Sequence, residues 1–209
     1  MTNRPGRLAA LSLLAANFAC ATPAFAHHMM GGKLPSTFGE GFLSGLGHPV
    51  IGLDHLAFIV AAGVVAGIAG LGLWMPAVFV AASIIGVFIH IQEIDRPATE
   101  VLIALSVVAI GALLAGNWSK LGRGAWAAIF AVAGVLHGYA FGESIVGAEP
   151  SPLLAYLAGL AVIQSAIAVG VAALVSRQAW ATGALAPRLA GAVVLGIGIA
   201  ALAGQVLPG

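Results

Sequence analysis

The hydrophobic positions of this chain are grouped in long blocks, and single glycines, prolines and charges separate one block from the next. Six apolar stretches follow one another, at residues 46–72, 75–92, 98–116, 125–147, 152–175 and 188–207. Each is long enough to cross the hydrocarbon core of a bilayer as a helix. The connections are too short for a soluble domain. The pattern predicts an all-α, polytopic membrane helical bundle, with residues 27–209 forming a single six-helix transmembrane domain.

The first 26 residues have a different pattern. Arg4 and Arg7 precede a short apolar run from Leu8 to Cys20, and residues 24–26 read Ala-Phe-Ala. A basic start, a short apolar segment and a small-x-small site are typical of a cleavable signal peptide. An uncleaved first helix is the alternative, but about 13 apolar residues are too few to span a bilayer. We therefore predict that residues 1–26 are a signal peptide.

Composition supports the membrane class and narrows the chemistry. Hydrophobic residues make up 61% of the chain and charged residues 7%, far from the average of soluble domains. The sequence contains no basic tract that would indicate a nucleic-acid partner. Cys20 is the only cysteine and would leave with the signal peptide. A thiolate metal site and a disulfide framework are thereby excluded from the mature chain.

The charges predict an orientation. A cleaved export signal places the mature N-terminus outside, and six crossings return the C-terminus to the same side. The basic residues in or beside the loops that this count makes cytoplasmic are Lys120, Arg123, Arg177 and Arg188. This distribution follows the positive-inside rule. We expect a multi-pass protein of the bacterial cytoplasmic membrane with both termini in the periplasm.

Candidate metal ligands gather where the first apolar stretch begins. His48, Asp54 and His55 lie within eight residues, and ionisable groups inside a membrane are usually functional. On a regular helix, positions 48 and 55 are about 10.5 Å apart, too far for one ion held about 2 Å from each nitrogen. Either a regular helix is broken here, or His48 belongs to a preceding segment that folds back. Pro49 fits a first helical turn and Gly52 permits further distortion, which favours His48 as a cap or loop ligand over the helix entrance.

A second polar window lies in the fourth stretch. His137 is followed six residues later by Glu143, as His48 is by Asp54. Because each half of the chain has three spans, a duplicated half would enter the membrane the opposite way round. A 3+3 inverted repeat is one interpretation of this match, and chance is the other.

Three further residues are candidates for metal binding. His27 and His28, with the new α-amine, could chelate a divalent ion, although a solvated N-terminal tail is the plainer interpretation. Glu100 opens the third stretch, where it is either a ligand on the ion pathway or a charge favoured by the helix dipole. His90 and Glu93 share a helical face, for which an interfacial hydrogen bond is preferred over a metal-binding pair.

Imidazole and carboxylate ligands without thiolate suit borderline divalent ions such as Ni²⁺, Co²⁺ and Zn²⁺. At this point a resemblance emerges: the motif His48-Pro-x-x-Gly-x-Asp54-His55 resembles the signature of the HupE/UreJ family of nickel and cobalt permeases. Further matching motifs are Pro97-x-x-Glu100 with Ser106, Leu136-His-Gly-Tyr-Ala-x-Gly-Glu143 and Tyr156-Leu-Ala-Gly159. The resemblance implies a secondary transporter, with His48, Asp54 and His55 handling Ni²⁺ or Co²⁺ as its substrate and no cofactor.

The chain departs from that family at two places. Phe141 and the Gln164-Ser165 pair stand where family members often carry histidine. The expected function is uptake of a divalent metal ion, without enzymatic activity. One alternative is a non-transporting accessory subunit that binds metal, and a less favoured one is an intramembrane zinc hydrolase. The lipid bilayer and the metal ion are the expected partners, and a homo-oligomer remains open.

Overall fold

The structure is a computed structural model that describes residues 33–92, 98–117, 121–180 and 184–207. The predicted signal peptide and the candidate ligands His27 and His28 lie outside these described residues. The part of the chain that is described contains seven α-helices and one 3₁₀ helix. They are α2 (Phe38–Ile51), α3 (Leu53–Ile68), α4 (Met75–His90), α5 (Thr99–Ala115), α6 (Arg123–Gly142), η2 (Glu143–Ile145), α7 (Pro150–Ser176) and α8 (Leu185–Val206).

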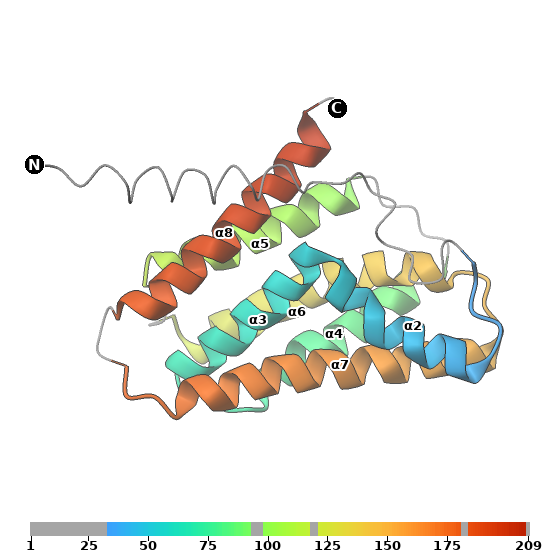
Figure 1. The fold of residues 1–209 in the computed structure, drawn as a ribbon, viewed down its shortest axis with the longest axis horizontal. Helices are drawn as coiled ribbons and strands as arrows, with labels where there is room; N and C mark the ends of the chain where they lie inside the picture. Colours follow the sequence, from blue (N-terminus) through green and yellow to red (C-terminus); the bar gives the residue numbers. More distant parts are fainter. Residues whose placement is uncertain (1–32, 93–97, 118–120, 181–183, 208–209) are drawn as a thin grey trace, which may run out of the picture.

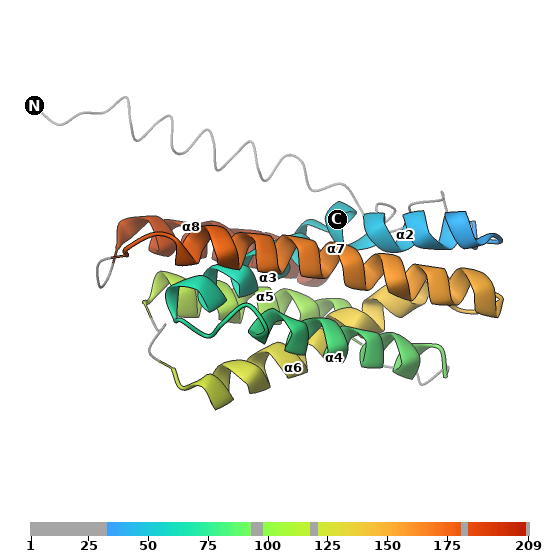
Figure 2. The same cartoon turned by 90° about the horizontal axis from the view of Figure 1, so that it is seen from below.

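Helix α3 lies at the centre of the bundle. It packs against α7, α5 and α8, while α4 pairs mainly with α6, and α5 mainly with α8. Figures 1 and 2 show α7 as the long helix that runs beside both α2 and α3. Ten of the 16 residues of α3 are buried, and after Asp54 and His55 the helix has only apolar residues, as expected for a helix enclosed by others.

The first apolar stretch is divided at Gly52 into two helices that meet at 80°. Gly52 has an extended backbone (φ −71°, ψ 104°) and ends α2 as it begins α3. The broken helix was predicted, but its details were wrong: Pro49 lies inside α2, and His48 is helical rather than in a cap or loop. The cause is an additional N-terminal helix, which begins at Phe38 after a capping box formed by Thr37 and Glu40.

The break makes a corner in a segment that otherwise runs along α7. Gly45 meets the α7 backbone at Tyr156, and Gly63 meets it at Ala168. The two glycines are 18 positions apart in sequence, whereas their contact points on α7 are only 12 positions apart. The surplus forms the corner around Gly52, and this corner carries His48 and His55 into the bundle.

Close helix packing depends on glycine at a few positions. In the α4–α6 pair, a Cβ on Gly138 would collide with the backbone of Ser83, and a Cβ on Gly86 would collide with the backbone of Val135. Small residues let membrane helices approach to this distance. The close approach brings Ser83, His137 and their neighbours into one buried layer.

The outward faces of the bundle are apolar. Leu154, Leu174 and Leu185 are 63–66% exposed, which suits lipid and would be costly in water. Among the described residues, three helices are long and apolar enough to cross a membrane, or four if α2 and α3 together form one broken span. Helices α4 and α5 are apolar but shorter, at 16 and 17 residues. The chain is a multi-pass helical membrane protein, and six crossings remain a prediction.

Candidate metal site

His48 is held at the end of α2 by hydroxyl groups from two other elements. Its side chain is 4% exposed. Its Nδ1 lies 3.0 Å from Ser144 Oγ, which belongs to η2, and 2.9 Å from the hydroxyl of Tyr156 on α7. The Tyr156 hydroxyl in turn donates to the carbonyl of Phe141 at 2.7 Å. These contacts fix the imidazole in a direction that α2 alone could not enforce.

His55 and His137 form a direct imidazole pair in the interior. The Nδ1 atoms are 2.8 Å apart, and the two residues are 1% and 0% exposed. His55 comes from the first turn of α3, whereas His137 comes from the last part of α6. The two residues are 82 positions apart in sequence, so no local pattern could predict this pair.

The hydrogen bonds determine which nitrogen of each ring carries the proton. Ser106 Oγ donates to the Ile103 carbonyl at 2.7 Å and lies 2.9 Å from His137 Nε2. With its only hydrogen used, this hydroxyl accepts from His137 Nε2–H. In a neutral ring, His137 Nδ1 is then an acceptor, and His55 Nδ1–H donates to it. The assignment places the lone pair of His55 on Nε2.

The same reasoning applies to His48. Because Tyr156 donates to a carbonyl, its oxygen accepts from His48 Nδ1–H. The lone pair of His48 is therefore also on Nε2. The His48 and His55 rings are edge-to-face, with centroids 6.2 Å apart. In their neutral forms, His48 and His55 thus present ligating lone pairs side by side next to the helix break.

Asp54 lies beside the histidines, in the first turn of α3. It is half-buried, and its Oδ1 accepts a hydrogen bond of 2.8 Å from the backbone N–H of His55. Among the described residues, no three His, Cys, Asp or Glu side chains are arranged to hold one metal ion. The structure brings His48, His55 and His137 together but contains no ready-made ligand set. Their metal-binding roles stay a prediction.

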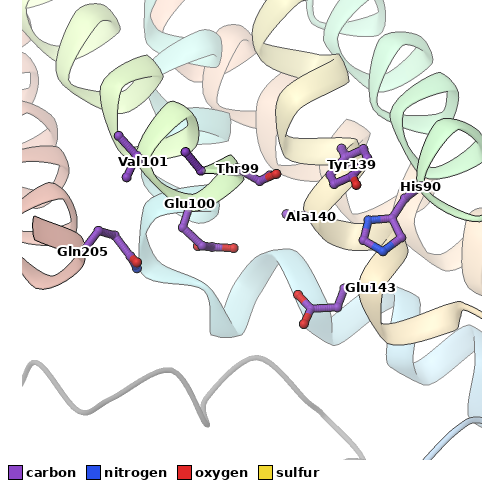
Figure 3. A pocket seen from close by; sticks show the side chains of 9 residues that line it. His90, Thr99, Glu100, Val101, Tyr139, Ala140, Glu143 and Gln205 are labelled. Carbon is purple, nitrogen blue, oxygen red and sulfur yellow. The ribbon is translucent and has the colours of Figure 1, made fainter. Parts of the chain in front are cut away.

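Glu100 and Glu143 lie in a separate pocket at the end of the bundle. This pocket has a volume of about 350 Å³ and is formed by α4, α5, α6 and α8 (Figure 3). The two carboxylates point toward one another across it. Glu143 lines this pocket rather than the histidine cluster, because it follows His137 by six positions and lies beyond the end of α6.

Sequence reasoning missed part of the environment of the histidines. Ser144 carried no signal of its own, and Tyr156 and Ser106 appeared only within the family resemblance. The one local signal for these residues is a hydroxyl within an apolar stretch. Because a buried hydroxyl needs a hydrogen-bond partner, it indicates a polar contact with another helix. Gln164 forms an interhelical hydrogen bond, because its Oε1 accepts from Ser83 Oγ at 3.0 Å.

A multi-pass helical membrane protein with a buried histidine cluster is the class that this architecture defines. The family described as HupE / UreJ protein matches residues 14–201, and the chain belongs to this family. It is 32% identical over 191 residues to Protein HupE of Rhizobium leguminosarum bv. viciae, covering 89% of this chain and 94% of that protein. No solved structure matches the chain.

Proposed function

We propose that this protein is a permease that takes up Ni²⁺ or Co²⁺ across the cytoplasmic membrane. Membership of the HupE/UreJ family supports metal transport in broad terms. The observation that carries the proposal is the meeting of His48, His55 and His137, from three helices, inside an otherwise apolar bundle. Packing alone gives no reason to bury three imidazoles, because each polar group removed from water needs a partner.

The donor chemistry supports a borderline divalent ion. Both lone pairs assigned above are on imidazole nitrogens, and the nearest carboxylate in sequence is Asp54. Such ligands suit Ni²⁺, Co²⁺ or Zn²⁺, and an ionised carboxylate offsets part of the cost of removing water from the cation. Only neutral imidazole binds metal, so uptake should weaken in acid that protonates these rings.

The absence of a three-ligand cluster among the described residues bears on the alternatives. A zinc hydrolase needs about three protein ligands around one resident ion, whereas a transported ion must leave each site and is better served by fewer ligands. The arrangement therefore favours transport over hydrolysis. A non-transporting accessory subunit is separated from a permease by reconstituting the purified chain alone in liposomes.

The proposal is tested by radioactive nickel and cobalt uptake into such liposomes. We expect His55→Ala and Asp54→Ala to reduce uptake at least tenfold at equal protein content. Glu149→Ala is the matched control, since it removes an exposed carboxylate at the start of α7. Unchanged uptake in both site variants would reject the permease, and activity with Zn²⁺ alone would correct the substrate.

A further inference from the structure

Two helix pairs of the bundle make their glycine contacts in the same register. In each pair, two glycines four positions apart on one helix meet backbone atoms of two residues that are four positions apart on the other. These contacts are Gly41 with Pro152 and Gly45 with Tyr156 in the α2–α7 pair, and Gly134 with Phe79 and Gly138 with Ser83 in the α4–α6 pair. A shift of 93 positions converts the α2 glycines into the α6 glycines, and a shift of 73 positions converts their contact points on α7 into those on α4.

A third glycine contact in each pair agrees with this register. Gly159 of α7 meets the backbone of Phe42, and Gly86 of α4 meets the backbone of Val135. These contacts are related by the same two shifts of 73 and 93 positions. Because the register exchanges α2 with α6 and α7 with α4, it relates the first half of the chain to the second, as an inverted repeat would.

The shared register makes His48 and Phe141 equivalent positions. They are separated by the same 93 positions that separate the glycines of α2 and α6. The match found in the sequence had instead paired His48 with His137. One half of the bundle therefore supplies an imidazole at this position, and the other half supplies a phenyl ring.

The ring of Phe141 adjoins all three imidazoles of the buried cluster. Its centroid lies 5.2 Å from that of His48, 4.5 Å from that of His55 and 6.5 Å from that of His137. Phe141 is fully buried, and the three histidines are at most 4% exposed. The phenyl ring thus occupies space directly beside the rings that carry the nitrogen donors.

A phenyl ring in that space keeps water out of it. Water stays in a protein interior only where it has both room and polar partners, and a phenyl ring supplies neither. Alanine at position 141 would leave room for a few water molecules, each of which occupies about 30 Å³. The neighbouring imidazoles would then serve as their hydrogen-bond partners.

Divalent ions differ in how readily they lose water to imidazole. Mg²⁺ prefers oxygen ligands, dehydrates reluctantly and usually keeps several of its waters when bound. Ni²⁺ and Co²⁺ bind imidazole well, so a histidine nitrogen can replace a water that they lose. A cluster without water therefore favours Ni²⁺ and Co²⁺ over Mg²⁺.

We propose that Phe141 is a specificity-determining residue, whose ring excludes water from the histidine cluster and thereby rejects ions that must keep their hydration shell. This role deepens the proposed transport function and rests on it. An ion passes the cluster only if imidazole nitrogens replace the waters that it leaves behind, which excludes Mg²⁺.

The test compares Mg²⁺ influx with Ni²⁺ uptake in liposomes that contain the purified full chain. An enclosed magnesium-sensitive dye measures the first, and radioactive nickel measures the second. The ratio of the two rates does not depend on the fraction of protein that is folded. We expect Phe141→Ala to raise this ratio about tenfold or more, because hydrated Mg²⁺ is then tolerated. Phe141→Leu keeps an apolar side chain and should leave the ratio within about twofold.

Phe130→Ala is the matched control. Phe130 is an equally buried phenylalanine of α6, but its ring packs against Trp126. Its replacement should leave the ratio unchanged even if it lowers both rates. If Phe141→Ala does not fold, Phe141→Val removes less volume and should raise the ratio to a smaller extent. An unchanged ratio in the folded Phe141 variants, or an equal rise in Phe130→Ala, would overturn the role of Phe141.

Failure of this role and failure of the transport function give different results. If nickel uptake depends on His55 while Phe141→Ala still rejects Mg²⁺, the role of Phe141 is wrong and the permease stands. If liposomes with the unmodified chain take up no nickel, the permease is wrong, and the role of Phe141 falls with it.

Discussion

Single hydroxyl groups determine the chemical state of the buried histidines. Ser106 uses its hydrogen on its own helix and so accepts from His137, which sets the proton position on His137 and, through it, on His55. Tyr156 does the same for His48. An imidazole that binds metal must present a lone pair, and the hydrogen bond on its other nitrogen decides which atom presents it.

Removing the Ser106 hydroxyl tests this role. Ser106→Ala should lower nickel uptake about fivefold, since a lost hydrogen bond of about 1 kcal/mol would release the proton position of His137. Ser106→Thr keeps a hydroxyl and should retain most of the uptake.

Ser83→Ala is the matched control for that experiment. It removes a fully buried hydroxyl whose partners are Val80 and Gln164 rather than a histidine. If Ser83→Ala and Ser106→Ala reduce uptake equally, the effect of Ser106 is general packing and not orientation of His137.

At the level of elements, the corner between α2 and α3 places the histidines. The glycine of the corner is adjacent to the site: a Cβ on Gly52 would lie 2.5 Å from His55 Cδ2. Because Gly52 has φ −71°, alanine is compatible with the backbone there. The constraint at this position is the space needed by the imidazole.

Gly52→Ala should therefore displace the His55 ring and reduce uptake severalfold with little change in melting temperature. The measurement is nickel uptake alongside thermal denaturation in detergent. A variant that loses stability but transports normally per folded molecule would contradict this account of the corner.

For glycines at contacts between helices we expect the opposite result, a loss of stability. Gly138→Ala should lower the free energy of unfolding by about 1–3 kcal/mol, because the Cβ would meet the Ser83 backbone. Gly170→Ala in α7 is the control, since no atom lies within 4 Å of its Cβ and alanine is the better helix former. Equal melting temperatures for the two variants would disprove close α4–α6 packing.

For the whole molecule, the described charges other than Lys33 and Asp54 divide between the two ends of the bundle. Arg123 donates to the Gly70 carbonyl and Arg188 to the Ala115 carbonyl, so the ends of α3 and α5 share one basic end. The carboxylates lie at the other helix ends. Glu40 and Glu100 are in the first turns of α2 and α5, and Glu143 and Glu149 are at the end of α6 and the start of α7. With the positive-inside rule, this division supports the proposed orientation.

Thiol labelling measures the orientation directly. In a Cys20→Ser background, Glu149→Cys should react with a membrane-impermeant maleimide in intact cells. Gln178→Cys, just beyond the end of α7, should react only after permeabilisation. The reverse pattern would invert the topology and place Glu100 and Glu143 on the cytoplasmic side.

Much of this architecture follows from local pattern. Apolar blocks predicted the helices, because a bilayer requires apolar side chains and internally satisfied backbone groups. Pro49 and Gly52 predicted the break. The additional helix α2 was missed, since residues 38–45 combine small, apolar and polar positions without a long apolar run.

What the sequence by itself determined is the membrane class, the helical fold, the family and the residues able to bind a metal. These properties depend on residue types and on spacings within about one helix. Only the tertiary structure decided that His55 pairs with His137, that Tyr156 and Ser106 set the proton positions, and that Glu143 lies in a pocket with His90 and Glu100. Such contacts join side chains that are many residues apart, and helix packing alone brings them within hydrogen-bonding distance.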